Sequence, residues 1–123
     1  TVLCSDVFQT LRTMRDRNET FDMIVLDPPK FAHTSQQVVK AARGYKDINL
    51  LALKLLSRGG LLFTFSCSGH ISSDLFQKIL ADAAVDSRRD VSIVRYLQQS
   101  EDHAVALNFP EGLYLKGLIC KAY

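Results

Sequence analysis

An apolar run that ends in two prolines places the tightest constraint on how this chain folds. Residues 23–26, Met-Ile-Val-Leu, are continuously apolar, which predicts a β-strand covered on both faces. Asp27, Pro28 and Pro29 follow at once. Prolines lack a backbone N–H and fix φ, so the strand ends at Leu26 and leaves Asp27 at its carboxyl end.

A carboxylate at this position has two interpretations. Open α/β sheets bind ligands beyond the carboxyl ends of their strands, which makes Asp27 a candidate ligand-binding residue. Asp and Pro also favour turns for purely local reasons, so the same residues fit a strand that ends in an Asp-Pro turn. These residue types alone leave both interpretations open.

The rest of the chain alternates between predicted strands and helices. Apolar runs predict further strands over residues 1–4, 61–65, 91–97 and 113–120. Helical periodicity predicts helices over 7–14, capped by Ser5 or Asp6; over 45–56, stopped by Gly59; and from Ser72 or Ser73 through 83. The polar stretch 31–44 has no firm period, and we predict a loop there that includes at most one helical turn.

This order predicts an α/β fold of three layers. Strands that alternate with helices form a mostly parallel sheet covered by helices. The last two strands have no helix between them, so we expect an antiparallel pair. No G-x-G-x-x-G turn is present, and three or four parallel strands make half of a doubly wound sheet. We therefore expect the second half of a larger domain.

The composition favours a globular domain in a reducing compartment. Of the 123 residues, 47% are hydrophobic, and a formal net charge of +2 is too small to indicate a nucleic-acid partner by itself. Cys4, Cys67 and Cys120 show no pairing pattern, which favours the cytosol. No apolar run reaches the ~18 residues of a membrane span, and the three histidines lack metal-ligand spacing.

Two predicted strand ends carry groups that suit catalysis. If the strands that end at Leu26 and Phe65 are parallel neighbours, Asp27 and Cys67 face one crevice. Cys67 also precedes a helix, and Lys30 is expected nearby; both features favour a thiolate. A thiolate beside a carboxylate suits nucleophilic catalysis. The alternative for Cys67 is a small buried residue in a Ser-rich turn.

Four stretches of the chain resemble a known enzyme family. They are Asp27-Pro28-Pro29-Lys30-Phe31, Gly44-Tyr45-Lys46-Asp47-Ile48-Asn49, Thr64-Phe65-Ser66-Cys67-Ser68-Gly69-His70 and Pro110-Glu111-Gly112-Leu113-Tyr114-Leu115-Lys116-Gly117. Together they are similar to the S-adenosylmethionine-dependent 5-methylcytosine methyltransferases of bacterial 23S rRNA that carry an amino-terminal PUA domain. The match covers nearly the whole chain.

The resemblance implies that residues 1–123 are the carboxyl-terminal part of a Rossmann-like methyltransferase domain. The strands with the Gly-rich cofactor turn, and the PUA domain, would lie outside these residues, which we expect to be inactive alone. The resemblance further implies a cytoplasmic enzyme whose cofactor is S-adenosylmethionine and whose partner is 23S rRNA, with no metal and no membrane. Cys67 would add to C6 of the cytosine, and Asp27 would hold the pyrimidine edge.

The same resemblance assigns residues to the two ligands. Asp6, Asp27 and Pro28 would contact the cofactor, and the residues that would contact the RNA are Pro29, Lys30, Phe31 and Tyr45. Many RNA 5-methylcytosine methyltransferases have a second cysteine where this chain has Lys30. The group that removes the C5 proton is therefore not identified.

Two other functions fit the same residues. A methyltransferase that acts on an exocyclic amino group would use Asp27 without needing Cys67. The chain could instead be a non-catalytic association module, because a sheet with an unpaired edge favours association. On that basis we expect the isolated piece to form dimers or to exchange segments.

Overall fold

The computed structural model describes residues 2–32, 34–98 and 116–123. Its elements are α1 (Val7–Asp16), β1 (Phe21–Leu26), the 3₁₀ helix η1 (Ser35–Gln37), α2 (Val38–Leu55), β2 (Leu56–Ser66), α3 (Ser73–Ser87), β3 (Val91–Gln98) and β4 (Lys116–Ala122). The strands form one sheet in the order β1-β2-β4-β3. β1 is parallel to β2, and β4 is antiparallel to β2 and β3. The predicted antiparallel pairing of the last two strands is confirmed.

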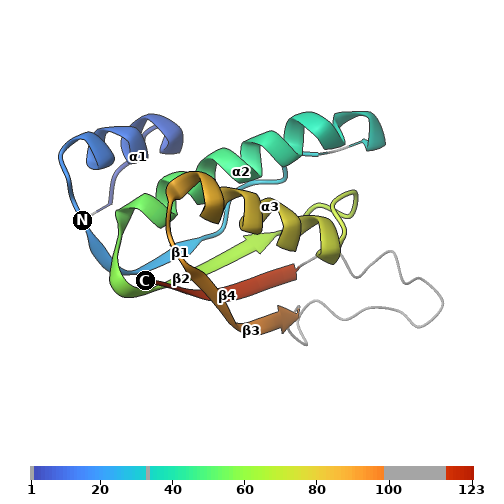
Figure 1. Cartoon of the computed structure of the whole chain (residues 1–123). Coiled ribbons are helices and arrows are strands. Elements are labelled where there is room, and N and C mark those ends of the chain that lie inside the picture. Colours follow the sequence, from blue (N-terminus) through green and yellow to red (C-terminus); the bar gives the residue numbers. More distant parts are fainter. Residues whose placement is uncertain (1, 33, 99–115) are drawn as a thin grey trace.

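The described helices all lie on one face of this sheet (Figure 1). On that face Leu62, Leu118 and Cys120 belong to the core that the strands form with α2 and α3. The other face carries Met23 and Val25, which are 55% and 64% exposed. The prediction of three layers and a mostly parallel sheet is therefore wrong for the described residues, which form two layers and a mixed sheet. The prediction that β1 is covered on both faces is wrong for the same reason.

The amino-terminal residues differ from the prediction in one respect. Residues 2–4 are exposed and form no strand, because no described strand lies beside β1 to pair with them. The helix that follows begins as predicted. Oδ1 of Asp6 accepts a 3.0 Å hydrogen bond from the backbone N–H of Phe8, so Asp6, rather than Ser5, is the N-cap of α1.

The segment 31–44 is not the predicted loop, because helix α2 begins within it, directly after η1. Oε1 of Gln37 accepts a 3.3 Å hydrogen bond from the backbone N–H of Thr34, which forms part of a capping box. Val38, Ala41 and Ala42 pack against the core at helical spacing, but two of the three are alanines, so the apolar period is weak in the sequence. Gly59 is also not the helix stop: α2 passes into β2 at Leu56, and Gly59 lies within the strand.

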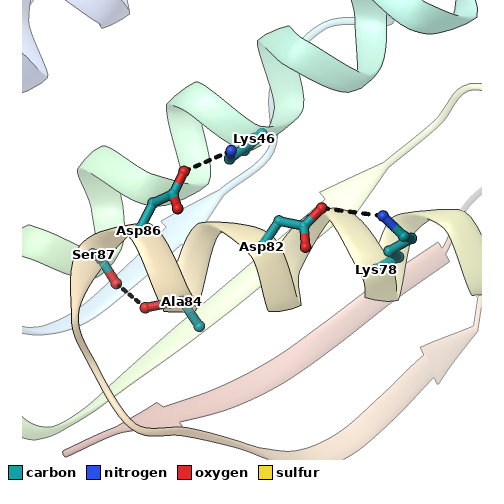
Figure 2. A network of polar contacts seen from close by, with 6 residues as sticks. All are labelled: Lys46, Lys78, Asp82, Ala84, Asp86 and Ser87. Carbon is teal, nitrogen blue, oxygen red and sulfur yellow. Dashed lines mark hydrogen bonds and ion pairs between the residues drawn. The ribbon is translucent and has the colours of Figure 1, made fainter.

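Helix α3 packs beside α2 and begins as the sequence predicts. The Ser72 side chain caps it by accepting a 3.1 Å hydrogen bond from the N–H of Leu75. At the surface, Nζ of Lys46 in α2 lies 2.6 Å from Oδ2 of Asp86 in α3 (Figure 2). This pair is largely exposed to solvent, so we attribute the α2–α3 association chiefly to the apolar side chains beneath it.

A buried polar network joins α2 to β2 next to the carboxyl end of the sheet. Nδ2 of Asn49 donates a 2.7 Å hydrogen bond to the carbonyl of Tyr45, one turn earlier in α2. The Thr64 hydroxyl donates a 2.6 Å hydrogen bond to Oδ1 of Asn49. All three side chains are 0% exposed, so these bonds fix the rotation of α2 against β2.

Candidate active site

Asp27 and Cys67 lie at the same edge of the sheet. β1 and β2 are parallel neighbours, and Leu26 pairs with Thr64 at their carboxyl ends. Asp27 follows β1 directly and is exposed, whereas Cys67 follows β2 directly and is half-buried. The sequence expectation that both strands end at one edge is confirmed.

A buried serine ties the two loops of this edge together. The Ser68 hydroxyl, in the loop after β2, donates a 3.0 Å hydrogen bond to the carbonyl of Ala32, in the loop after β1. The backbone carbonyl of Ser68 also accepts a 3.2 Å hydrogen bond from Ile71. Because these contacts lie in the core, the loops that carry Asp27 and Cys67 are held in a fixed relation.

The proline loop after β1 divides into buried and exposed residues. Pro28 is buried, whereas Pro29 and Lys30 are exposed. Phe31 is half-buried and lines a surface pocket of about 280 Å³ between α1 and α2, together with Phe8, Gln37, Lys40, Ala41 and Gly44. Neither Asp27 nor Cys67 lines that pocket, so the catalytic candidates lie on the open edge of the sheet.

Tyr45 lies behind this edge, in the core. Its ring packs edge-on against Phe31, 4.6 Å between centroids, and against Phe76, 6.0 Å between centroids. The side chain is 0% exposed, so Tyr45 cannot stack on an RNA base from this position. The structure thus disagrees with a substrate contact for Tyr45 and gives it a packing role instead.

The buried Tyr45 hydroxyl is close enough to Cys67 for the two groups to interact electrostatically. It lies near the Ser66 side chain, the Phe31 backbone and Cys67, yet it makes no hydrogen bond of good geometry. Burial raises the pKa of Tyr45 above its ordinary value, so the hydroxyl keeps its proton at neutral pH. A buried hydroxyl without a well-formed hydrogen bond costs folding free energy.

Lys116 is a site residue that the sequence reasoning missed. Its register partner is Ser66, the last residue of β2, and its Nζ donates a 2.8 Å hydrogen bond to the carbonyl of Ser68. Burial lowers the pKa of Lys116, and the nearby Cys67 acts in the opposite direction. A charged residue at the start of an otherwise mostly apolar strand was the available signal, but only the strand order reveals its neighbour.

The described residues give no indication of a metal or membrane site. In 2–32, 34–98 and 116–123, no three His, Cys, Asp or Glu side chains form a group that could hold a metal ion. His70 is exposed, and His33 and His103 lie outside the described residues. In the same ranges, no helix has the length and apolar character needed to cross a membrane.

The fold matches part of several methyltransferase chains of known structure. The chain superposes with a TM-score of 0.77 on a candidate methyltransferase complexed with SAH, at 24% identity, covering 95% of this chain and 30% of that chain. It superposes with a TM-score of 0.64 on a methyltransferase homolog from Pyrococcus horikoshii, at 15% identity, covering 100% of this chain and 45% of that chain. At these identities the likeness establishes the fold.

The sequence comparison is more specific. The chain is 60% identical over 116 residues to the Ribosomal RNA large subunit methyltransferase I of Escherichia coli O1:K1 / APEC, covering 94% of this chain and 29% of that protein. The protein of the same name from Shigella boydii serotype 18 gives the same identity and coverage. The chain thus spans about 29% of the length of these relatives, and it is homologous to that part of them. The resemblance stated from the sequence is confirmed, and no family model matches the chain.

Proposed function

We propose that this chain is part of the catalytic domain of a cytoplasmic S-adenosylmethionine-dependent methyltransferase that acts on C5 of a cytosine in 23S rRNA. The observation that carries the proposal is the placement of Asp27 and Cys67 after two adjacent parallel strands, with their loops joined through Ser68. The 60% identity to a ribosomal RNA large subunit methyltransferase supports rRNA as the substrate.

The proposed reaction depends on Cys67, because C5 of cytosine is a poor nucleophile unless the ring is activated. The Cys67 thiolate adds to C6, which forms a sulfur–carbon bond and shifts the C5–C6 electron pair onto C5. S-adenosylmethionine, when bound, supplies the methyl group that C5 takes up. A base then removes the C5 proton, the double bond re-forms, and the sulfur–carbon bond breaks to release Cys67.

Asp27 stabilises the ring while it accepts charge. Its exposed carboxyl group follows the last residue of β1, where it can hydrogen-bond the N3/N4 edge of the cytosine. A hydrogen bond that a protonated Asp27 donates to N3 strengthens as electron density moves onto the ring during thiolate addition. Asp27 therefore lowers the barrier to addition and also selects cytosine by its Watson–Crick edge.

The residues at this edge also fit the proposed cofactor. Asp6 would contact the cofactor's adenine, as the family resemblance implies. The exposed carboxyl group of Asp27 suits a cofactor that is positively charged at its sulfonium and amine. The capping bond of Asp6 to the Phe8 N–H uses Oδ1. Pro28 is buried directly after Asp27 and fixes the backbone there. We assign Asp6, Asp27 and Pro28 to the cofactor.

The exposed part of the proline loop is the proposed RNA contact. Pro29 and Lys30 are exposed and Phe31 is half-buried, so these residues can meet a nucleotide that leaves its helix. Lys30 stands where many RNA 5-methylcytosine methyltransferases have a second cysteine. We expect Lys30 to contact the RNA backbone rather than to take part in product release.

A trapping experiment tests this function in the natural polypeptide that contains these residues. RNA with 5-fluorocytosine at candidate sites is incubated with the protein and S-adenosylmethionine. Fluorine cannot leave as a proton, so we expect a covalent protein–RNA adduct on Cys67 that is lost in Cys67→Ala. Cys4→Ala is the matched control, since Cys4 is also a free cysteine, and it should still form the adduct. Methylation of normal RNA without any adduct would favour the amino-group methyltransferase.

Association of copies is a second property that the structure supports. β1 is at the edge of the described sheet, and Met23 and Val25 on it are largely exposed. Exposed edges and apolar faces promote pairing between chains, so we propose that the isolated 123 residues form dimers. Sedimentation of the isolated chain tests this, and a stable monomer at micromolar concentration would contradict it.

A further inference from the structure

Lys116 reaches the segment that carries Cys67 from the neighbouring strand. It is the first residue of β4 and pairs with Ser66, the residue before Cys67. Its Nζ donates a 2.8 Å hydrogen bond to the carbonyl of Ser68, the residue after Cys67. The lysine is therefore held at the residues on both sides of Cys67: its backbone pairs with Ser66, and its side chain bonds to Ser68.

The surroundings of Lys116 strengthen its electrostatic effect on Cys67. The lysine side chain is half-buried, and Ser68, which it contacts, is 0% exposed. A charge that is partly shielded from water interacts more strongly with its neighbours than a charge on the surface. An ammonium group beside a thiol favours the thiolate, which is the form that attacks carbon.

Other titratable groups also lie around Cys67. Tyr45 approaches from α2 with a buried hydroxyl that makes no hydrogen bond, Asp27 and Lys30 lie on the loop after β1, and His70 follows in the loop of Cys67. Asp27 is exposed, whereas the half-buried Lys116 donates a hydrogen bond directly to this loop.

We propose that Lys116 is a positioning residue for the nucleophile. It fixes the Cys67 loop through Ser68 and stabilises the thiolate of Cys67 by its positive charge. This inference rests on the proposed function, in which that thiolate adds to C6 of the cytosine. It assigns β4, which carries neither of the predicted catalytic residues, a direct part in the reaction.

Alkylation of cysteines by iodoacetamide tests the proposal without cofactor or RNA. The natural polypeptide is alkylated across a range of pH, and mass spectrometry of its peptides gives the rate at Cys67 relative to the exposed Cys4. In Lys116→Gln, which can keep a donor for Ser68 but has no charge, we expect the neutral-pH rate at Cys67 to fall about threefold to tenfold. The pH midpoint should move upward by a corresponding amount.

Two further variants make the result decisive. Lys116→Arg keeps the charge and should retain most of the rate, whereas Lys121→Met removes a lysine from the same strand and should change nothing. A wild-type rate and pH midpoint in Lys116→Gln would overturn the proposal. If the proposed function alone fails, Lys116 still controls alkylation, but no 5-fluorocytosine adduct forms. If this inference alone fails, the adduct forms, and the alkylation rate at Cys67 is the same with and without Lys116.

Discussion

The hydroxyl of Thr64 in β2 donates a 2.6 Å hydrogen bond to Oδ1 of Asn49 in α2, and both side chains are 0% exposed. Asn49 in turn donates to the Tyr45 carbonyl at 2.7 Å. Tyr45 packs behind Cys67, so this chain of bonds sets the position of α2 relative to the candidate nucleophile. The buried polar atoms of this network hydrogen-bond to one another, so removing one of them leaves its partner unpaired and lowers the free energy of unfolding.

Replacing either member of this pair should therefore destabilise the protein. Asn49→Leu leaves the Thr64 hydroxyl without its acceptor, and Thr64→Val leaves Asn49 Oδ1 without its donor. We expect each change to lower the free energy of unfolding by about 1–3 kcal/mol, measured by urea denaturation. The double variant should lose less free energy of unfolding than the two single losses added together, because neither side chain then leaves a buried polar group without its partner. Additive losses would contradict a direct coupling.

Gly117 should tolerate no side chain, because β2, β3 and β4 approach closely there. A Cβ at this position would lie 2.6 Å from Cδ1 of Phe65 and 3.2 Å from Cβ of Leu97. We expect Gly117→Ala to lower the free energy of unfolding by about 1–3 kcal/mol. The control is Gly44→Ala inside α2, where a Cβ would meet Phe31 at an ordinary 3.6 Å. That change should raise stability by about 0.5–1 kcal/mol. The opposite order of stabilities would contradict this account.

The sequence predicted those features that depend on neighbouring residues. The caps at Asp6 and Ser72, and the strand end at Leu26, follow from side chains that act within a few positions. The common edge of Asp27 and Cys67 was also predictable, because two strands separated by one helix are usually parallel neighbours.

The features that the sequence did not predict depend on contacts between distant segments. Nothing local indicates that β4 lies between β2 and β3, and so the approach of Lys116 to Ser68 could not be foreseen. The burial of Tyr45 likewise results from Phe31 and Phe76, which come from two other segments. The start of α2 was not predicted as part of a long helix, because its core-facing positions Val38, Ala41 and Ala42 include two alanines and give only a weak apolar period.

Arg89 should be far more important for stability than its neighbour Arg88. Its guanidinium donates hydrogen bonds to the carbonyls of Leu53, Leu56 and Ser57 at the junction of α2 and β2, and to the Tyr123 backbone oxygen. Arg89→Met removes all of these bonds, and the Leu53 carbonyl keeps only the N–H of Leu56, so the change should lower the free energy of unfolding by about 2–4 kcal/mol in urea denaturation.

The matched control for Arg89 is Arg88→Gly. Arg88 is exposed and has a positive φ of 58° at the end of α3, a conformation that glycine adopts without strain. This variant should be more stable than the wild type by about 0.5–1 kcal/mol. If Arg89→Met stays within experimental error of the wild type, the guanidinium bonds contribute nothing and the prediction fails.

The buried thiol of Cys120 should make the folded state sensitive to alkaline pH. Burial raises the pKa of Cys120 to about 11 from its ordinary 9.0, so between these values the unfolded chain loses its proton first. The free energy of unfolding should therefore fall as pH rises, by about 1–3 kcal/mol at pH 11, in urea denaturation. The raised pKa of Tyr45 further lowers the free energy of unfolding as the pH rises above 10. The lowered pKa of Lys116 has the opposite effect: it raises the free energy of unfolding as the pH rises just below 10.5. Cys120→Val has no such proton and keeps the contributions of Tyr45, Lys116 and Lys46, whose pKa the Asp86 hydrogen bond raises, so identical pH profiles for variant and wild type would refute the assignment.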